Sequence, residues 1–258
     1  KMKIKNNILR KLKKKLDNTS LTIGSWLQLD EANSALIISK SKFEWIAVDL
    51  EHGFFSENNL PNMFKSILMG GAIPFARLQD SSKTSIVRAM DAGAYGLIIP
   101  NIESKEQLQD VVKFANYPPK GKRGVGYCPA NNYGNNFEGY IETIKNPIII
   151  AMIESKKGLE NIDKIITCEG FNGILIGPYD LSASLNITGK FSNKKFKSAI
   201  KKILGTCKLN KKSAGIHQVK PSISDLKKLI KQGFNFIPYG MDSVFLSNNY
   251  PDIKKWKY

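Results

Sequence analysis

The sequence predicts a (β/α)8 TIM barrel that occupies residues 1–258 as a single domain. Eight short apolar runs alternate with stretches of helical character along the chain. The apolar runs lack strict apolar–polar alternation, as expected where both faces of a parallel sheet are buried. The length of 258 residues is close to the roughly 250 residues typical of this barrel. An open doubly wound sheet is the alternative, but no GxGxxG motif follows the first strand.

The individual elements follow from the apolar runs and from the glycines between them. We expect strands at residues 22–28, 45–51, 73–79, 95–102, 147–155, 172–178, 213–218 and 234–240. Glycines that cap helices ahead of the next strand are expected at Gly71, Gly93, Gly170 and Gly233. A long loop, "YPPKGKRGVGYCPANNYG", interrupts the alternation before the fifth strand. The pattern therefore counts eight strand–helix units.

Residues 1–20 form a basic segment ahead of the first strand. Ile8, Leu9, Leu12 and Leu16 recur at helical spacing, which predicts an amphipathic helix packed on the barrel. The chain carries a formal charge of +17, yet only four of its 39 basic residues are arginine. Recognition of bases and phosphates favours the planar guanidinium, and the lysines are scattered along helices. We therefore expect no nucleic-acid partner.

The chain shows no sign of membrane insertion or of a disulfide framework. No apolar run approaches the roughly 20 residues that span a bilayer, and the basic N-terminus lacks the apolar core of a signal peptide. Three widely spaced cysteines fit neither a zinc pattern nor paired disulfides. We expect a cytoplasmic protein with no membrane partner.

Polar residues gather where the predicted strands end. In a barrel of this class the chemistry lies at the carboxyl ends of the strands, which meet at one mouth. The polar residues expected there are Glu51, His52, Arg77, Glu154, Asp180, His217 and Asp242. Any one of them could be a strand terminus that faces solvent, and for His217 a place on the solvent-facing rim is the favoured interpretation. Their occurrence at the same end of successive strands favours a reaction site.

These residue types suit chemistry at the carbon beside a carbonyl group. Glu154 and Asp180 follow adjacent strands and could hold one hard divalent cation, Mg²⁺ or Mn²⁺ rather than zinc. Arg77 offers a planar fork for a substrate carboxylate, and Arg123 in "GKRGVG" is the next candidate. His52 could act as a general base, a role for which histidine is the most common side chain. A Schiff-base route is less favoured, because no lysine stands out at the end of the fifth or sixth strand.

The order and spacing of several motifs resemble the HpcH/HpaI aldolases. The resemblance runs from "GSW" near residue 24 to "GMD" at 240–242. It includes "VDLEHG", "PFARL", "MDAGAYGLIIPNIES", "YPPKGKRGVG", "MIES" and "GPYDLSASL". The family implies the same barrel and a metal-dependent class II aldolase that cleaves a 4-hydroxy-2-oxo acid to pyruvate and an aldehyde. It also implies Mg²⁺ or Mn²⁺, possible use of Co²⁺, and a homo-oligomer, commonly a hexamer.

The resemblance assigns roles to residues of this chain. Glu154 and Asp180 would bind the metal, and Arg77 the oxo acid. His52 would work with an aspartate that by position is Asp91, while Asp49 would support the same strand end. The backbone N–H groups of Gly177 and Tyr179 would hold the substrate carboxylate, because Pro178 between them has none.

The chain also departs from the family pattern. Met152 stands where many members carry glutamine, two residues before the metal-binding glutamate, and Pro129-Ala130 stands where many carry Arg-Ala. The first change removes a polar contact near the oxo acid, and the second alters the loop where the aldehyde is expected to enter. Three alternatives therefore remain. The protein could be an oxaloacetate decarboxylase or a lyase acting on CoA thioesters, or it could be a barrel that has lost aldolase turnover and serves binding or assembly.

Overall fold

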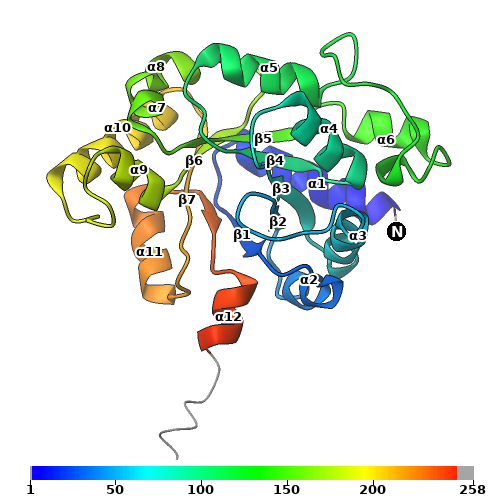
Figure 1. The fold of residues 1–258 in the computed structure, drawn as a ribbon, viewed down its shortest axis with the longest axis horizontal. Helices are drawn as coiled ribbons and strands as arrows, with labels where there is room; N and C mark the ends of the chain where they lie inside the picture. The colour runs from blue at the N-terminus through cyan, green and yellow to red at the C-terminus, as the bar shows by residue number, and fades with distance from the viewer. Residues whose placement is uncertain (1, 249–258) are drawn as a thin grey trace, which may run out of the picture.

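In the computed structural model, which describes residues 2–248, the chain forms a closed barrel of parallel strands (Figure 1). The strands follow one another around the barrel in sequence order, and β8 closes onto β1 through the pair Thr22 and Phe236. Their bounds are β1 Thr22–Leu27, β2 Trp45–Asp49, β3 Ile73–Arg77, β4 Gly96–Ile99, β5 Ile148–Ile153, β6 Gly173–Ile176, β7 Ser213–Ile216 and β8 Phe236–Pro238. The predicted barrel is confirmed, and each strand lies inside its predicted range.

Helices surround the barrel and carry the chain back to the start of each next strand (Figure 1). Ser82, Ser104, Ser155 and Ser222 each accept a backbone N–H at a helix N-terminus, which explains where these helices begin. The helices are α1 Met2–Asp17, α2 Ala32–Ser39, α3 Leu60–Gly70, α4 Lys83–Ala92, α5 Lys105–Ala115, α6 Phe137–Thr143, α7 Lys156–Glu160, α8 Ile162–Ile165, α9 Pro178–Ser184, α10 Lys194–Leu209, α11 Ile223–Gln232 and α12 Asp242–Asn248, with the 3-10 turn η1 at Pro129–Asn131.

Three of the four predicted glycine caps are confirmed. Gly71, Gly93 and Gly233 end α3, α4 and α11 with positive φ. The prediction for Gly170 is wrong, because α8 already ends at Ile165 and Gly170 lies in the turn that follows. The helical segment after β5 breaks at Asn161, whose side-chain N–H donates to the Glu103 carbonyl at 2.8 Å.

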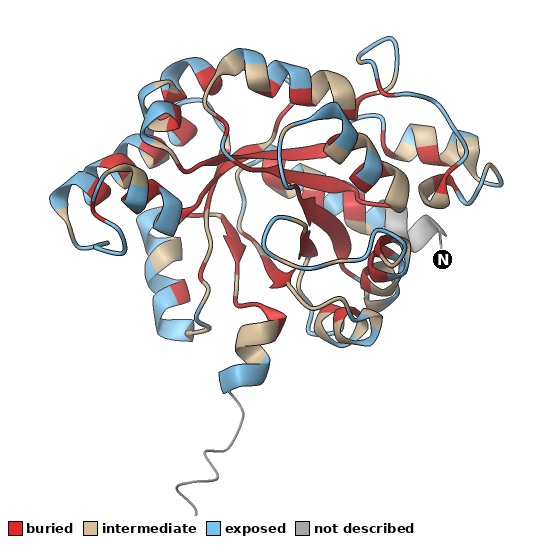
Figure 2. Cartoon of the chain, viewed as in Figure 1, coloured by how far each residue is buried: buried red, intermediate tan, exposed pale blue. Residues whose placement is uncertain are grey.

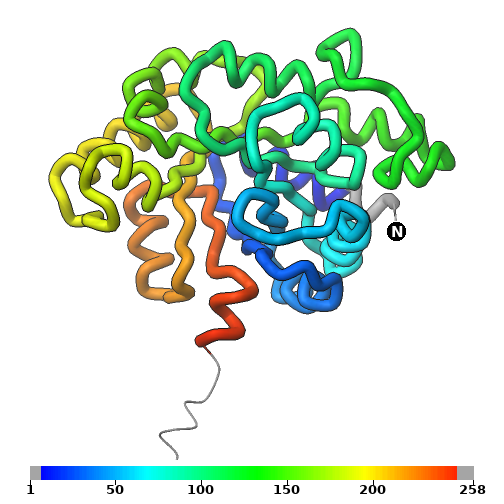
Figure 3. The backbone as a smooth tube through the Cα atoms, viewed as in Figure 1, coloured from blue at the N-terminus to red at the C-terminus, as the bar shows by residue number. Residues whose placement is uncertain are grey.

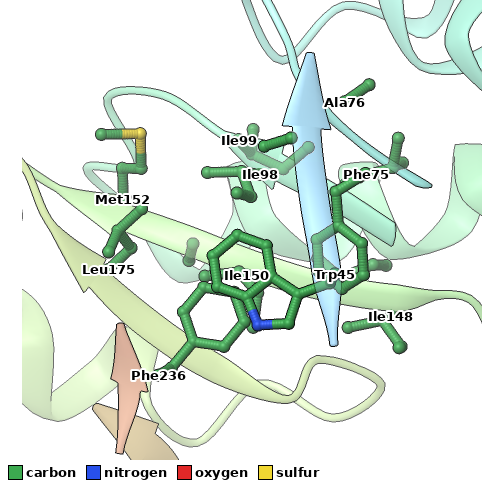
Figure 4. Packing of buried hydrophobic residues seen from close by; sticks show 14 of the residues in the cluster. Trp45, Phe75, Ala76, Ile98, Ile99, Ile148, Ile150, Met152, Leu175 and Phe236 are labelled. Carbon is green, nitrogen blue, oxygen red and sulfur yellow. The ribbon is translucent and has the colours of Figure 1, made fainter. Parts of the chain in front are cut away.

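Aromatic rings fill the part of the barrel interior near the amino ends of the strands (Figure 4). Trp45 stacks on Phe236 with ring centroids 4.2 Å apart and nearly parallel planes, and on Phe75 at 5.2 Å. Gly24 and Gly96 have no side chain at the points where these rings lie, so the rings can cross the barrel axis. The interior is thus a packed core rather than a pore.

Helix α1 covers the amino end of the barrel. Its Leu9, Leu12 and Leu16 side chains are buried in the core, and the Leu16 carbonyl accepts the Ser213 hydroxyl at the start of β7. The strands are buried almost throughout, whereas the helices expose their outer faces (Figure 2). In the described part of the chain, no helix combines the length and apolar character needed to cross a membrane.

The loop between α5 and α6 is the long interruption that the sequence predicts, and it extends to one side of the barrel (Figure 3). The buried Asn131 organises it: Oδ1 accepts the N–H groups of Cys128 and Gly134, and Nδ2 donates to the Gly126 carbonyl. Pro129 therefore lies in an ordered turn, and Tyr127 and Tyr133 are exposed beside it.

Candidate active site

The register of the strands directs one set of side chains into the barrel mouth. Residues of a strand alternate between its two faces, so inward positions recur every second residue. The inward residues Trp45 and Phe75 are followed on the same faces by Asp49 and Arg77, which pair in register. The chemistry predicted at the strand ends therefore lies directly above the aromatic core.

Two carboxylates hold Arg77. Its Nη1 donates to Asp49 Oδ1 at 3.1 Å, and its Nη2 pairs with the Glu51 carboxylate. Both Arg77 and Asp49 are buried, and Arg77 Nε has no partner among the described residues. The guanidinium is thus fixed in place while part of its hydrogen-bonding capacity stays free for a ligand.

The two carboxylates titrate differently. Burial alone would raise the pKa of Asp49, but the charge of Arg77, the Trp26 indole and two backbone N–H groups together hold it below its ordinary value. Asp49 accepts Trp26 Nε1 at 2.9 Å and the N–H of His52 at 3.1 Å. For Glu51, burial outweighs the attraction of Arg77 and raises the pKa. Asp49 therefore holds Arg77 as a carboxylate that stays ionised, whereas Glu51 is protonated more easily and pairs with Arg77 less strongly.

Glu154 carries a carboxylate oxygen with no protein partner. Its Oε1 accepts the Asn101 N–H at 2.7 Å, while Oε2 is buried without a hydrogen bond within residues 2–248. Burial raises the pKa of Glu154 to about 7, and the charges of Asp180 and Glu51 add to the effect. A Cβ on Gly177 would overlap Oε2, so any larger residue here would displace the Glu154 carboxylate. A buried oxygen of this kind, surrounded by further carboxylates, fits a hard cation as its missing partner.

Asp180 approaches the same region from β6. It lies in the first turn of α9, after Gly177 and Pro178, and it is exposed. The Tyr179 N–H belongs to the same first turn, where N–H groups have no acceptor within the helix. In the part of the chain that the structure describes, no three histidine, cysteine or acidic side chains group as a metal site. The residues present thus offer two carboxylates, and water and substrate would complete the coordination.

His52 and Asp91 do not contact each other through any hydrogen bond found between residues 2 and 248. His52 is exposed on the loop after β2, where its N–H donates to Asp49. Asp91, on α4, accepts Arg123 Nη2 at 2.5 Å. The pairing of His52 with Asp91 stays a prediction.

Arg123 belongs to the long loop rather than to the mouth. Its side chain is fully buried between the rings of Tyr117 and Tyr140, at 4.6 and 5.6 Å from their centroids, and it pairs with Asp91. The guanidinium therefore fastens the loop to α4. Its position does not support its choice as the second candidate for the substrate carboxylate.

Two further polar residues of the predicted mouth have structural contacts. Asp242 is buried and accepts the N–H groups of Gln28 and Leu29 at 2.8 and 2.9 Å, so it ties the chain after β8 to the end of β1. His217 is half-buried after the end of β7, and its ring packs on Trp26 with centroids 4.8 Å apart, so its place on the solvent-facing rim stays a prediction. Burial lowers the pKa of His217 to about 4, which keeps the ring uncharged at neutral pH.

The sequence did not indicate one residue of the site, Trp26, although "GSW" contributes to the family resemblance. Glu51 was expected at the mouth, but its pairing with Arg77 was not. Both depend on cross-strand geometry, which a linear pattern does not contain. Met152, the departure beside Glu154, is buried on the inner face of β5 (Figure 4).

Fold and site together define a class of protein: a barrel enzyme with an anchored arginine and paired carboxylates at the strand ends. The family model of the HpcH/HpaI aldolase/citrate lyase family matches residues 22–249, so the chain belongs to this family of lyases. The 5-keto-4-deoxy-D-glucarate aldolase of Escherichia fergusonii is 32% identical over 90% of this chain and 90% of its own length. The hydroxypyruvate/pyruvate aldolase of Roseobacter denitrificans is 29% identical over 96% and 98%.

Solved structures share the fold. A HpcH/HpaI aldolase/citrate lyase family protein from Burkholderia cenocepacia superimposes with a TM-score of 0.86 at 24% identity, covering 92% of this chain and 95% of its own. A more distant match is the citrate lyase beta subunit of M. tuberculosis, complexed with oxaloacetate and magnesium. Its TM-score is 0.58 at 14% identity, covering 89% of this chain and 95% of its own.

Proposed function

We propose that the protein is a metal-dependent carbon–carbon lyase that cleaves a 4-hydroxy-2-oxo acid to pyruvate and an aldehyde, or forms the acid from them. The observation that carries the proposal is the unpartnered, buried Oε2 of Glu154 in the same mouth as the anchored Arg77. The names of the two aldolase relatives support the reaction type. The magnesium in the citrate lyase neighbour supports a divalent cation.

Glu154 and Asp180 would hold the cation, which we propose to be Mg²⁺ or Mn²⁺, with Co²⁺ as a substitute. When bound, the cation would polarise the 2-oxo group and lower the free energy of the enolate. Arg77 would bind the carboxylate or oxo group of the acid through the donors that Asp49 and Glu51 leave free. The N–H groups of Gly177 and Tyr179 would donate hydrogen bonds to the substrate carboxylate at the start of α9.

His52 would supply the base. In the cleavage direction it takes the proton of the C4 hydroxyl, the C3–C4 bond breaks, the aldehyde leaves, and the electron pair of that bond becomes the enolate of pyruvate. A proton then adds to C3 to give pyruvate. Asp91 is the proposed partner of His52, and the expected homo-oligomeric assembly is part of the same proposal.

Metal removal tests the proposal with two readouts. Exhaustive chelation is expected to abolish oxaloacetate decarboxylation and aldol turnover, and Mn²⁺, Mg²⁺ or Co²⁺ to restore both. Glu154→Gln and Asp180→Asn should also lose Mn²⁺ binding in calorimetric titration of the metal-free protein. Asp163→Asn is the matched control, since Asp163 pairs with Lys202 on the surface. Full activity without metal would refute the proposal and reopen a Schiff-base route.

A further inference from the structure

His217 faces the barrel mouth. Gly215 of β7 pairs with Phe236, which lies in the aromatic core, so Gly215 faces inward. Two residues further along the chain, His217 follows on the same face, beyond the end of the strand. Its ring packs on Trp26, the inward residue near the end of β1. His217 therefore belongs to the inner wall of the mouth, although it lies outside the residues assigned to the reaction.

Strand order places His217 on the far side of the mouth from Arg77. Arg77 ends β3, Glu154 and Asp180 follow β5 and β6, and β7 comes next around the barrel. Trp26 and Asp49 separate the His217 ring from Arg77. An oxo acid held between Arg77 and the two carboxylates thus leaves His217 to meet the rest of the substrate, the part released as the aldehyde.

The hydrogen bonding of the ring defines what it can recognise. Nε2 lies 3.3 Å from the Gly240 carbonyl oxygen, and a carbonyl can only accept, so Nε2 carries the proton. In the neutral ring Nδ1 is then an acceptor. Among residues 2–248 no hydrogen-bond donor to Nδ1 is found. The lowered pKa of His217 keeps the ring in this neutral form at pH 7.

We propose that His217 selects substrates whose aldehyde half carries a hydroxyl group, which donates a hydrogen bond to Nδ1. The carboxylate and oxo groups of the acid are acceptors, and its C4 hydroxyl is assigned to His52, so none of them satisfies Nδ1, whereas a further hydroxyl on the aldehyde half can. An alkyl aldehyde would leave this acceptor without a partner when it displaces water from the mouth. The inference rests on the proposed aldolase function and specifies the substrate class of that site.

Two aldehydes of nearly equal size test the inference. Glycolaldehyde and propanal differ by a hydroxyl in place of a methyl group, and each would be condensed with pyruvate in the presence of Mn²⁺. The wild type is expected to prefer glycolaldehyde in kcat/KM. His217→Phe keeps an aromatic ring on Trp26 but removes the acceptor, so the preference should fall by about 3–10-fold, the effect of one neutral hydrogen bond. His217→Asn restores an acceptor near Nδ1 and should retain most of the preference.

Oxaloacetate decarboxylation separates this inference from the proposed function, because that reaction has no aldehyde. The aldol activity of each of the three proteins is therefore compared with its own rate of oxaloacetate decarboxylation. The inference would be overturned if His217→Phe kept the preference for glycolaldehyde or lost activity equally with both aldehydes. It would also be overturned if His217→Asn discriminated between the aldehydes no better than His217→Phe. A wild type that decarboxylates oxaloacetate but uses neither aldehyde would overturn it as well. A wild type inactive in every assay would refute the proposed function itself.

Discussion

The two ends of the barrel use the same strands for different purposes. The lower layer lies near the amino ends of the strands, where Trp45, Phe75 and Phe236 stack on one another. The upper layer lies at the carboxyl ends, in the mouth. Four residues beyond Trp45, about 13 Å along the strand, Asp49 binds Arg77. The aromatic layer buries apolar surface, which favours folding wherever it occurs. The upper layer is made of charges whose burial costs free energy unless they are paired.

The upper layer leaves some atoms of its charged side chains without a partner, whereas the aromatic side chains of the lower layer carry no charge. This difference indicates which layer binds a ligand. Arg77 Nε and Glu154 Oε2 have no partner among the described residues. The lower layer also contains one polar atom in this condition, Trp45 Nε1, but an indole N–H is neutral and its desolvation costs much less. Unpaired charged atoms that converge on one mouth indicate a bound ligand. Substitutions in the upper layer should therefore change chemistry, and those in the lower layer should change stability.

His52 gives the largest expected effect in the upper layer. His52→Ala should slow aldol cleavage by roughly 10²–10⁴-fold if the imidazole is the general base. Oxaloacetate decarboxylation should suffer less, because no C4 hydroxyl loses a proton. Steady-state kinetics of both reactions make the measurement. Equal, large losses in the two reactions would instead assign His52 a structural or binding role.

Phe236 tests the lower layer. Phe236→Ala should lower the free energy of unfolding by about 3–5 kcal/mol, because it removes a fully buried ring from the stack. Urea denaturation measures the change, and Phe54→Ala, which truncates a 96% exposed ring, should stay within about 0.5 kcal/mol of wild type. The KM for oxaloacetate of folded Phe236→Ala should change little. A large rise in KM would show that the two layers are coupled.

His217 belongs to the upper layer but should leave a stability signature. Its pKa is about 4 in the folded protein, mainly because burial disfavours the charged ring; Arg77 acts in the same direction, and the Gly240 carbonyl and Asp49 oppose it. An unfolded histidine titrates near 6.5, so between pH 6.5 and pH 4 the unfolded chain binds the extra proton. Stability should therefore fall as the pH falls through this window, by about 3 kcal/mol in total from this group.

The pH effect is measured as a difference between two proteins. Urea unfolding at pH 7, 5.5 and 4.5 would be compared for wild type and His217→Phe, so that the titration of shared carboxylates cancels. The wild type should lose more stability than the variant on acidification. Parallel pH profiles would show that the folded protein protonates His217 as easily as the unfolded chain does.

The sequence predicted the barrel because each strand can be recognised from its own local residue pattern. Runs such as "WIAVD" and "PIIIAMI" are apolar on both faces and lie between helical patterns, so their number and order need no knowledge of the third dimension. The cap predicted at Gly170 failed because α8 ends at Ile165. The helical segment before it also breaks at Asn161, whose side chain contacts the Glu103 carbonyl more than fifty residues earlier.

The site was predicted residue by residue but not contact by contact. Arg77, Glu154 and Asp180 could be placed at strand ends from the pattern alone, and the structure brings them to one mouth. The pairing of Glu51 with Arg77 depends on the register of neighbouring strands, and so does the packing of His217 on Trp26. Register is determined by packing across the barrel, which a single sequence does not display.

Arg77→Lys should have a smaller effect than His52→Ala, and it tests the upper layer most specifically, because it keeps the charge and changes only its geometry. An ammonium is a point charge, whereas the guanidinium contacts Asp49 and Glu51 and still has donors left. Losing one charge-assisted hydrogen bond, worth about 1.5–3 kcal/mol, predicts a drop of roughly 10–150-fold in kcat/KM on oxaloacetate. The variant should stay folded and keep the metal content of wild type, since Asp49 keeps a cationic partner. Arg123 offers no substitute, being buried between Tyr117 and Tyr140. Wild-type efficiency in the lysine variant would therefore mean that the oxo acid is held by the start of α9 alone.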